Sequence, residues 1–196
     1  MVEHVDSPSI YLPCPLSCSE KDKDAIPEIS LSKKLDHRYL DLRSCINHSI
    51  FKIQHCVTES FRRLLSNQGF AEIHTPKLIK GATESGATVF PVKYFDGEAF
   101  LAQSPQLYKQ MAINSDFRRV FEVGPVFRAE KSFTRKHLTE FTGLDFEMRI
   151  KKDYHEINSI MHYLITSIID SVQKFCGDEL KIIKTANQDC PLSNGY

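Results

Sequence analysis

Apolar residues three or four positions apart mark two long segments of the chain. They run through residues 44–67 and again through residues 153–175, and in each segment they form a single stripe. That spacing puts side chains on one face of an α-helix, so the pattern predicts two amphipathic helices. Gly69 and Gly177 follow the two stripes and are predicted to end them.

A period of two replaces the helical period in residues 119–129 and 142–150. In both segments every second residue is mostly apolar, and the positions between them carry charges or glycine. Such alternation is typical of strands that bury one face and expose the other. The connection, residues 131–137, is polar and basic, which predicts an antiparallel pair with a long loop at its tip. The charged side chains expected on the exposed face are Glu122, Arg128, Glu130, Asp145 and Glu147.

Shorter elements lie between these segments. Residues 70–75 read as a strand ended by proline, and Asp96-Gly97 lies between two strand-like runs as a hairpin turn. Ser104-Pro105 has the form of an N-cap followed by a first-turn proline, which predicts a helix to about Asn114. The order helix, strand, hairpin, helix, strand–loop–strand, helix predicts the α+β class. We expect an antiparallel sheet flanked by helices that pack on one side of it.

Composition and charge narrow the class of protein. The chain has 25 basic and 25 acidic residues among 196, which excludes a generally cationic nucleic-acid coat but leaves room for a local basic patch. We find no run near the 18 apolar residues of a membrane span, and the first residues do not resemble a secretory signal. A cytoplasmic protein without membrane contact is therefore expected. The six cysteines form no CxxC pair and no set with metal-ligand spacing, so no metal site is predicted.

The charged face of the predicted strand pair has two interpretations. An arginine between carboxylates suits a phosphate held by the guanidinium, with metal ions or an ammonium held by the acids. The basic loop beside it could contact a second polyanion, which together suggests a nucleotide site approached by nucleic acid. The other interpretation is a solvated sheet face with cross-strand salt bridges, and the alternation alone favours it.

Five segments, in this order, resemble the catalytic domain of class II aminoacyl-tRNA synthetases, most closely the aspartyl-tRNA synthetases of eukaryotic or archaeal type. They are residues 35–43 (LDHRYLDLR), 69–78 (GFAEIHTPKL), 100–110 (FLAQSPQLYKQ), 124–130 (GPVFRAE) and 137–148 (HLTEFTGLDFEM). The resemblance covers about two-thirds of the chain. It implies a partial catalytic domain with motifs 1 and 2 at residues 35–178. Residues 1–34 are expected to be an irregular linker or the remnant of an anticodon-binding barrel, and residues 179–196 an irregular tail.

The resemblance implies an aspartate–tRNA ligase reaction. The α-carboxylate of L-aspartate attacks the α-phosphate of ATP, giving aspartyl-adenylate and pyrophosphate, and tRNA(Asp) then takes the aspartyl group. No protein nucleophile is required, because catalysis consists of positioning and of stabilising charge on the phosphate, with Mg²⁺ as the metal. ATP, L-aspartate, tRNA(Asp) and a second copy of the chain are the implied partners.

The same resemblance implies which residues are catalytic and which bind ATP. Arg128 matches the motif 2 arginine that grips the α-phosphate and the substrate carboxylate, and is the catalytic residue. The implied ATP-binding set is Arg128, Glu130, Lys136, His137, Leu138 and Phe141. Phe141 also stands out by itself, since the alternation puts it on the polar face, where a core phenylalanine would be misplaced. His137 taken alone would be read as a surface histidine.

Amino-acid and tRNA contacts follow in the same way. The implied aspartate-binding set is Glu84, Gln106, Lys109, Arg128 and Asp145. In it Lys109 pairs with the substrate's side-chain carboxylate, Asp145 holds its ammonium, and Glu84 belongs to a mobile closing loop. The residues implied at the tRNA acceptor end are Lys131, Ser132, Thr134 and Arg135. The implied dimer interface includes Pro76, although the apolar stripe of residues 44–67 suits a monomer core equally well.

One departure from the family leaves two alternatives open. The chain contains no match to motif 3, with its second ATP-binding arginine, so the 196 residues alone are expected to be inactive or nearly so. Asparaginyl-tRNA synthetase, or a related asparagine synthetase, remains an alternative. A non-catalytic binding or dimerisation protein derived from a synthetase is the other.

Overall fold

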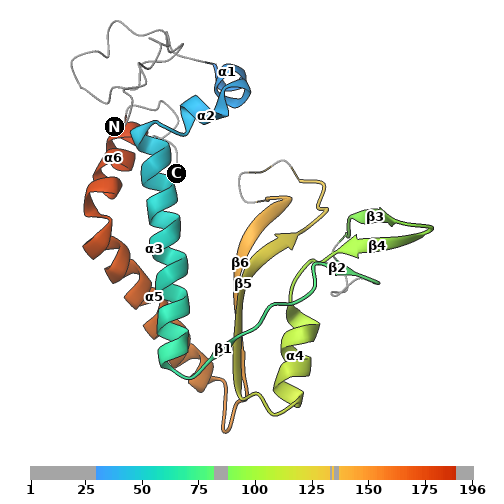
Figure 1. The fold of residues 1–196 in the computed structure, drawn as a ribbon. Helices are drawn as coiled ribbons and strands as arrows, with labels where there is room; N and C mark the ends of the chain where they lie inside the picture. The colour runs from blue at the N-terminus through green and yellow to red at the C-terminus, as the bar shows by residue number, and fades with distance from the viewer. Residues whose placement is uncertain (1–29, 82–87, 133, 135–136, 189–196) are drawn as a thin grey trace, which may run out of the picture. The chain divides into compact units, whose positions relative to one another are not determined.

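The computed structural model describes residues 30–81, 88–132, 134 and 137–188, which form two compact units (Figure 1). One unit contains the described residues up to 55 and from 173 onward, and the other contains those between 56 and 172. The helices of the described residues are α1 (Leu31–Asp36), α2 (Arg38–Asp41), α3 (Cys45–Asn67), α4 (Gln106–Asn114), α5 (His155–Phe175) and α6 (Gly177–Gln188). The strands are β1 (Ala71–Glu72), β2 (Leu78–Ile79), β3 (Pro91–Tyr94), β4 (Gly97–Leu101), β5 (Arg119–Phe127) and β6 (Glu140–Met148).

The two predicted long helices are confirmed as α3 and α5, and their apolar stripes supply the core of the unit of residues 56–172. Phe61, Leu64 and Leu65 of α3 pack with Leu164 of α5 against the β5–β6 ribbon. The ribbon contributes Phe121, whose ring meets that of Phe61 edge to face at 5.9 Å. Burying these side chains supplies the main stabilising term for this unit.

The predicted strand pair is confirmed as the antiparallel ribbon β5–β6. Glu122 lies opposite Asp145, and Val126 lies opposite Phe141, so the charged positions of both strands share one face. On the other face Phe121 lies opposite Phe146, toward the core. The alternation therefore decides which side chains face the hydrophobic core and which lie on the charged face.

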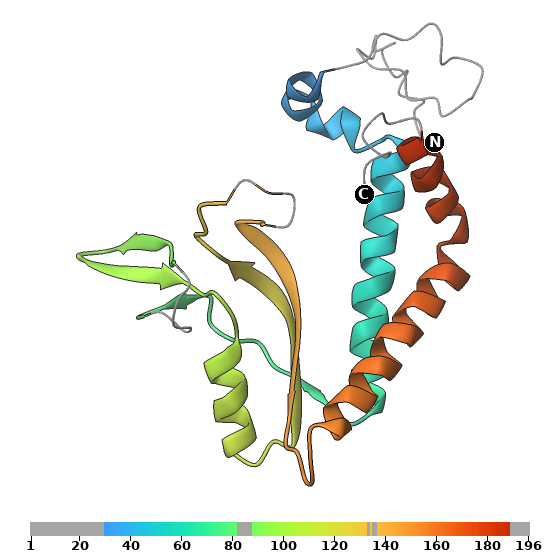
Figure 2. The same cartoon turned by 180° about the vertical axis from the view of Figure 1, so that it is seen from behind.

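Helices cover both faces of the ribbon, so the prediction that they pack on one side is wrong. α3 and α5 cover the apolar face, whereas α4 contacts β5 and β6 from the charged face (Figures 1 and 2). α4 contacts the charged face through Lys109, whose ammonium pairs with the carboxylates of Asp145 and Glu147.

Two smaller differences from the predicted sheet concern β1 and the hairpin. β1 is only two residues long, and it pairs with β5 in parallel rather than antiparallel. The strand stops there because the next free N–H, that of Thr75, donates to the Glu122 carboxylate at 3.1 Å instead of to a backbone carbonyl. β2, β4 and β3 form a separate three-stranded sheet. Its hairpin turns at Phe95 and Asp96, with positive φ at Phe95, so Gly97 already lies within β4.

The start of α4 is displaced by one residue from the prediction. Pro105, rather than Ser104, occupies the N-cap, and its carbonyl accepts from the Lys109 N–H at 3.0 Å. The Ser104 hydroxyl still accepts from the Gln106 N–H at 3.3 Å, so it serves one of the free donors at the helix start.

The predicted irregular tail from residue 179 is helical as far as Gln188 in α6, and α1 likewise lies partly within the predicted irregular segment 1–34. Gly177, predicted as a stop, begins α6. Asp178 and Glu179 occupy its first turn, where negative charge interacts favourably with the helix dipole. Glu179 also accepts a 2.8 Å hydrogen bond from Lys52 of α3, within the unit of residues 1–55 and 173–196. Within the described ranges, no helix is both long and apolar enough to span a bilayer.

Candidate functional site

Five residues around the open end of the β5–β6 ribbon line a cavity of about 380 Å³, which we call the Arg128 cavity. They are Arg128, Glu130, His137, Leu138 and Phe141. Four of them lie in the connection between β5 and β6, and Phe141 is the second residue of β6. Because the ribbon is antiparallel, positions 13 residues apart in sequence, such as 128 and 141, meet at the same end.

Arg128 and Phe141 form the centre of this cavity. The guanidinium carbon of Arg128 lies 5.6 Å from the centroid of the Phe141 ring, within the range of a cation–π contact. The Nε atom of Arg128 is buried and has no hydrogen-bond partner among the described residues. A buried N–H without an acceptor costs about 1–3 kcal/mol, so this arginine is arranged to receive an anionic oxygen.

The loop at the ribbon tip is tied to the cavity through His137. Its Nε2 lies 3.6 Å from Oε2 of Glu130, and its Nδ1 is 3.1 Å from the Ser132 hydroxyl and also bonds the Thr134 hydroxyl. The backbone N–H of Arg128 donates to the backbone carbonyl of Thr139 at 2.9 Å, which closes the base of the loop. These contacts hold the loop's polar side chains beside the guanidinium.

A second group of charges lies on the same face, further along β6. We call Lys109, Asp145, Glu147 and Gln106 the Lys109 cluster. Lys109 is only 3% exposed, and its ammonium lies 3.3 Å from Oδ1 of Asp145 and 3.5 Å from Oε2 of Glu147. Gln106 Nε2 donates to the same Glu147 oxygen at 3.4 Å. One cation between two carboxylates leaves an excess of negative charge, which suits the ammonium group of a ligand.

Gly143 lies on β6 between the Arg128 cavity and the Lys109 cluster. Phe141 and Asp145 lie on one face of β6, about 14 Å apart along an extended strand, with Gly143 between them. A Cβ at Gly143 would lie 2.9 Å from Cγ2 of Val126 and 3.0 Å from Oδ2 of Asp145. The neighbouring side chains therefore leave no room for a side chain at this position, which requires glycine.

One charged residue of the predicted face behaves differently. The alternation predicts that Glu122 projects from the open surface, but it is 2% exposed and bonds to the partly buried Thr75 and Lys77. Its carboxylate accepts from the Thr75 hydroxyl at 2.8 Å and from the Lys77 ammonium at 2.7 Å. We call these three residues the Glu122 network. Thr75 and Lys77 were not predicted from the sequence, because a strand's periodicity does not show which distant segment packs across it.

A family model, tRNA synthetases class II (D, K and N), matches residues 30–190 of the chain. This chain belongs to that family. Aspartate–tRNA ligase, cytoplasmic 1, of Dictyostelium discoideum is 52% identical over 157 residues, which cover 80% of this chain and 27% of the relative. The match to the family confirms the resemblance found in the sequence.

Solved structures of class II synthetases have the same fold as this chain. The aspartyl-tRNA synthetase of Entamoeba histolytica superposes with a TM-score of 0.68 at 51% identity, covering 81% of this chain and 29% of that one. The asparaginyl-tRNA synthetase of Pyrococcus horikoshii, complexed with asparaginyl-adenylate, gives a TM-score of 0.72 at 36% identity, covering 79% and 35%. This class II synthetase chain thus spans about a third of the length of these relatives.

The predicted site residues of this class II chain fall into three groups. Five of the six predicted ATP-binding residues line the Arg128 cavity, and Gln106, Lys109 and Asp145 of the aspartate set lie together in the Lys109 cluster. The third group lies elsewhere: Lys131, Ser132 and Thr134 are in the loop, and Pro76 is exposed beside the Glu122 network. The remaining predictions, Glu84, Arg135 and Lys136, lie outside the described residues.

No group of three or more His, Cys, Asp or Glu side chains among the described residues is arranged to hold a metal ion.

Proposed function

We propose that this chain forms the amino-acid activation site of an aspartate–tRNA ligase. The observation that carries the proposal is a pair of features on one face of the same ribbon. They are a buried guanidinium nitrogen without a hydrogen-bond partner among the described residues and a lysine–carboxylate cluster. The named relatives, aspartate–tRNA ligase in Dictyostelium and aspartyl-tRNA synthetase in Entamoeba, support the same substrate.

Arg128 binds an oxygen of the α-phosphate of ATP through its free Nε–H and holds the carboxylate of aspartate beside it. When that carboxylate attacks the α-phosphorus, the bond to pyrophosphate breaks and negative charge on the phosphate oxygens grows. A fixed guanidinium stabilises this charge without reorganising. Magnesium bound with the phosphates supplies further charge neutralisation. Phe141 stacks on the adenine, and Glu130 accepts from its amino group.

The Lys109 cluster selects the amino acid. The side-chain carboxylate of aspartate becomes a partner of the Lys109 ammonium, and Asp145 then holds the substrate's ammonium. Asp145 is then no longer a partner of Lys109, and because this ammonium is almost completely buried, the carboxylate of the substrate has to replace it. An uncharged amide in that place leaves the lysine less well compensated, which disfavours asparagine.

In the second half-reaction, the loop between β5 and β6 binds the tRNA that accepts the aspartyl group. Ser132 and Thr134, held by His137, contact the acceptor end of tRNA(Asp), and Lys131 and Arg135 add attraction for its phosphates. We further propose that the protein acts in the cytoplasm, as the name of its Dictyostelium relative indicates, and as a homodimer that includes Pro76 in its interface.

Two other functions compete with this one. An asparaginyl-tRNA synthetase, or a related asparagine synthetase, is supported by the likeness to the Pyrococcus horikoshii enzyme. The buried Lys109 ammonium favours aspartate over asparagine as the bound amino acid. A non-catalytic protein derived from a synthetase would have no need for a guanidinium nitrogen kept buried and free.

Binding of a non-hydrolysable aspartyl-adenylate sulfamoyl analogue to the 196-residue chain, measured by calorimetry, tests the proposal. Arg128→Ala is expected to weaken binding at least tenfold, because hydrogen bonds to charged groups contribute about 1.5–3 kcal/mol. Arg63→Ala, which removes a half-exposed arginine of α3, is the matched control and should bind like the original chain. The asparaginyl analogue should bind at least tenfold more weakly than the aspartyl one. Equal affinity for both analogues would favour the asparaginyl alternative, and no binding of either would favour the non-catalytic one.

Activity of the chain by itself is a separate question. We expect little or no aspartate-dependent ATP–pyrophosphate exchange by the 196 residues, since the second ATP-binding arginine of the family has no match in the chain. Robust exchange would contradict that expectation.

A further inference from the structure

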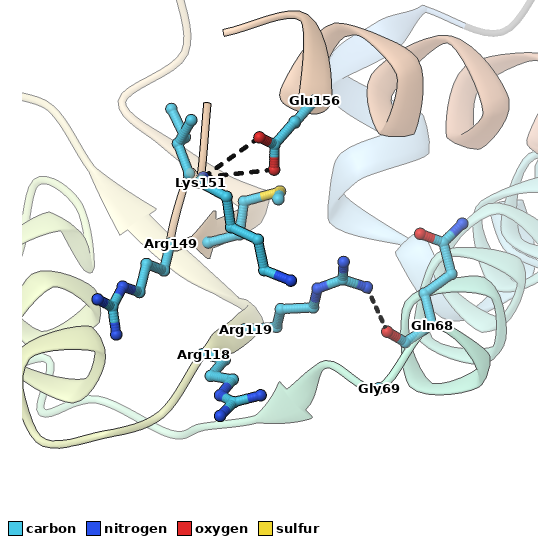
Figure 3. A pocket seen from close by; sticks show the side chains of 9 residues that line it. Gln68, Gly69, Arg118, Arg119, Arg149, Lys151 and Glu156 are labelled. Atoms are coloured by element: carbon cyan, nitrogen blue, oxygen red, sulfur yellow. Dashed lines mark hydrogen bonds between the residues drawn. The ribbon is translucent and has the colours of Figure 1, made fainter. Parts of the chain in front are cut away.

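A second cavity, of about 620 Å³, lies at the opposite end of the ribbon from the Arg128 cavity (Figure 3). It surrounds the start of β5 and the end of β6, where Arg119 lies opposite Met148. The strand from Arg119 to Phe127 is about 27 Å long, so this ribbon-base cavity is distinct from the nucleotide site.

Positive charge dominates the ribbon-base cavity. Arg118, Arg119, Arg149 and Lys151 line it, together with a single carboxylate, that of Glu156. Figure 3 shows Arg119 and Lys151 directed into the same space, with Arg118 and Arg149 at its margin. The chain as a whole is neutral, so this is a local separation of charge.

The one carboxylate does not neutralise these cations. Glu156 accepts hydrogen bonds from the backbone N–H groups of Lys151 and Lys152, the shortest at 2.7 Å. Its oxygens therefore satisfy the backbone just before α5. None of the side chains of Arg118, Arg149 and Lys151 lies within salt-bridge distance of a carboxylate in the part of the chain that the structure describes.

Arg119 is held in place for a ligand. One of its terminal nitrogens donates to the Gln68 carbonyl at 2.7 Å, and its guanidinium carbon lies 5.4 Å from the centre of the Phe70 ring. A guanidinium has five N–H donors, so donors remain after this contact. A fixed arginine loses little side-chain freedom when an anion binds, which favours binding.

We propose that the ribbon-base cavity binds phosphate oxyanions, supplied either by an RNA backbone or by a free polyphosphate. Four cations around one space repel one another, and an anion with several oxygens relieves that repulsion. The volume lies in the range of ordinary ligand cavities and exceeds what a single phosphate fills. Arg118, Arg149 and Lys151 are exposed, so an extended chain of phosphates can reach them.

The test uses the 196-residue chain with Arg128→Ala as background, so that the nucleotide site does not contribute. Binding of a fluorescein-labelled single-stranded 12-nucleotide RNA is followed by fluorescence polarisation over a range of salt concentrations. Arg149→Ala/Lys151→Ala is compared with a control double variant, Lys80→Ala/Lys93→Ala, which removes the same charge from exposed positions. We expect the first pair to weaken binding at least tenfold and to reduce the salt slope by about 1.4, the value for two phosphate contacts on a single strand.

Competition by unlabelled pyrophosphate or tripolyphosphate identifies the source of the phosphates. Displacement of the RNA at polyphosphate concentrations below about 1 mM supports a free polyphosphate as the ligand. If the RNA is not displaced, the RNA backbone is supported as the ligand. If RNA does not bind, protection of the Arg119 amide from hydrogen exchange by tripolyphosphate, lost in Arg149→Ala/Lys151→Ala, supports the polyphosphate. Equal losses in the two double variants, or no response to either probe, would overturn the proposal. All of these measurements use protein without the Arg128 guanidinium. A negative result therefore does not bear on the proposed activation site.

Discussion

Replacing Lys77 with methionine removes the charged end of the Glu122 network and keeps most of the apolar stem. Glu122 is 2% exposed, and afterwards it retains only the two hydrogen bonds from Thr75, at 3.1 and 2.8 Å. Removing one partner of a buried ion pair costs about 3–5 kcal/mol. The Lys77 side chain is 24% exposed, so water can partly replace its ammonium, and we expect the lower end, about 3 kcal/mol.

Hydrogen exchange of the Ile73 amide measures this loss of stability beside the Glu122 network. The Ile73 N–H donates to the Phe121 carbonyl at 2.9 Å, directly beside the network. A loss of about 3 kcal/mol corresponds to about 150-fold faster exchange of this amide where exchange follows opening equilibria. Lys93→Met, at an exposed position of β3, is the control and should change exchange by less than about threefold.

A double variant separates the pair from its surroundings. Glu122→Gln combined with Lys77→Met leaves no uncompensated charge, so protection of the Ile73 amide should recover in part relative to Lys77→Met alone. If Lys77→Met behaves like its control, or if the double variant loses the full sum of both single losses, Glu122 does not depend on Lys77. Either result would refute the role of Lys77 as the cation that compensates the buried carboxylate.

Three further substitutions test other parts of the structure. Gly143→Ala should destabilise the ribbon by about 1–3 kcal/mol in urea unfolding, because its Cβ would lie 2.9 Å from a side-chain carbon, whereas Gly81→Ala, in open space, should not. Lys109→Met should cost about 3 kcal/mol by leaving two carboxylates without their cation and should abolish the preference for the aspartyl over the asparaginyl analogue, so an unchanged preference would contradict the selection mechanism. The hydrogen bond from Lys52 lowers the pKa of Glu179 below its ordinary 4.5, so the stabilisation is present above pH 4.5 and is lost as the pH falls through the lower, folded-state value. The protection factors of the α6 amides, which correct for the intrinsic pH dependence of exchange, should fall over that range. Glu179→Gln should remove the part of this fall that depends on Lys52, whereas the part that depends on Asp178 and Lys181 remains.

The periodicity of the sequence determined the local geometry of the site. A strand alternates its side chains with period two, so the positions of Phe141 and Asp145 on one face follow from the sequence alone. The same rule identified the antiparallel ribbon, and the 3.6-residue period identified α3 and α5. In each case the information lies within the element itself, and one buried face is enough to reveal it.

Tertiary structure decided whatever depends on two segments far apart in the sequence. Lys77 lies 45 residues from Glu122, and only the crossing of their segments turns an apparently open carboxylate into a buried one. The ribbon-base cavity gathers Gln68, Arg119 and Lys151 in the same way, without any local pattern that joins them. A side chain's face is set by its own backbone, whereas its burial and its charge partners are set by the segments that pack against it.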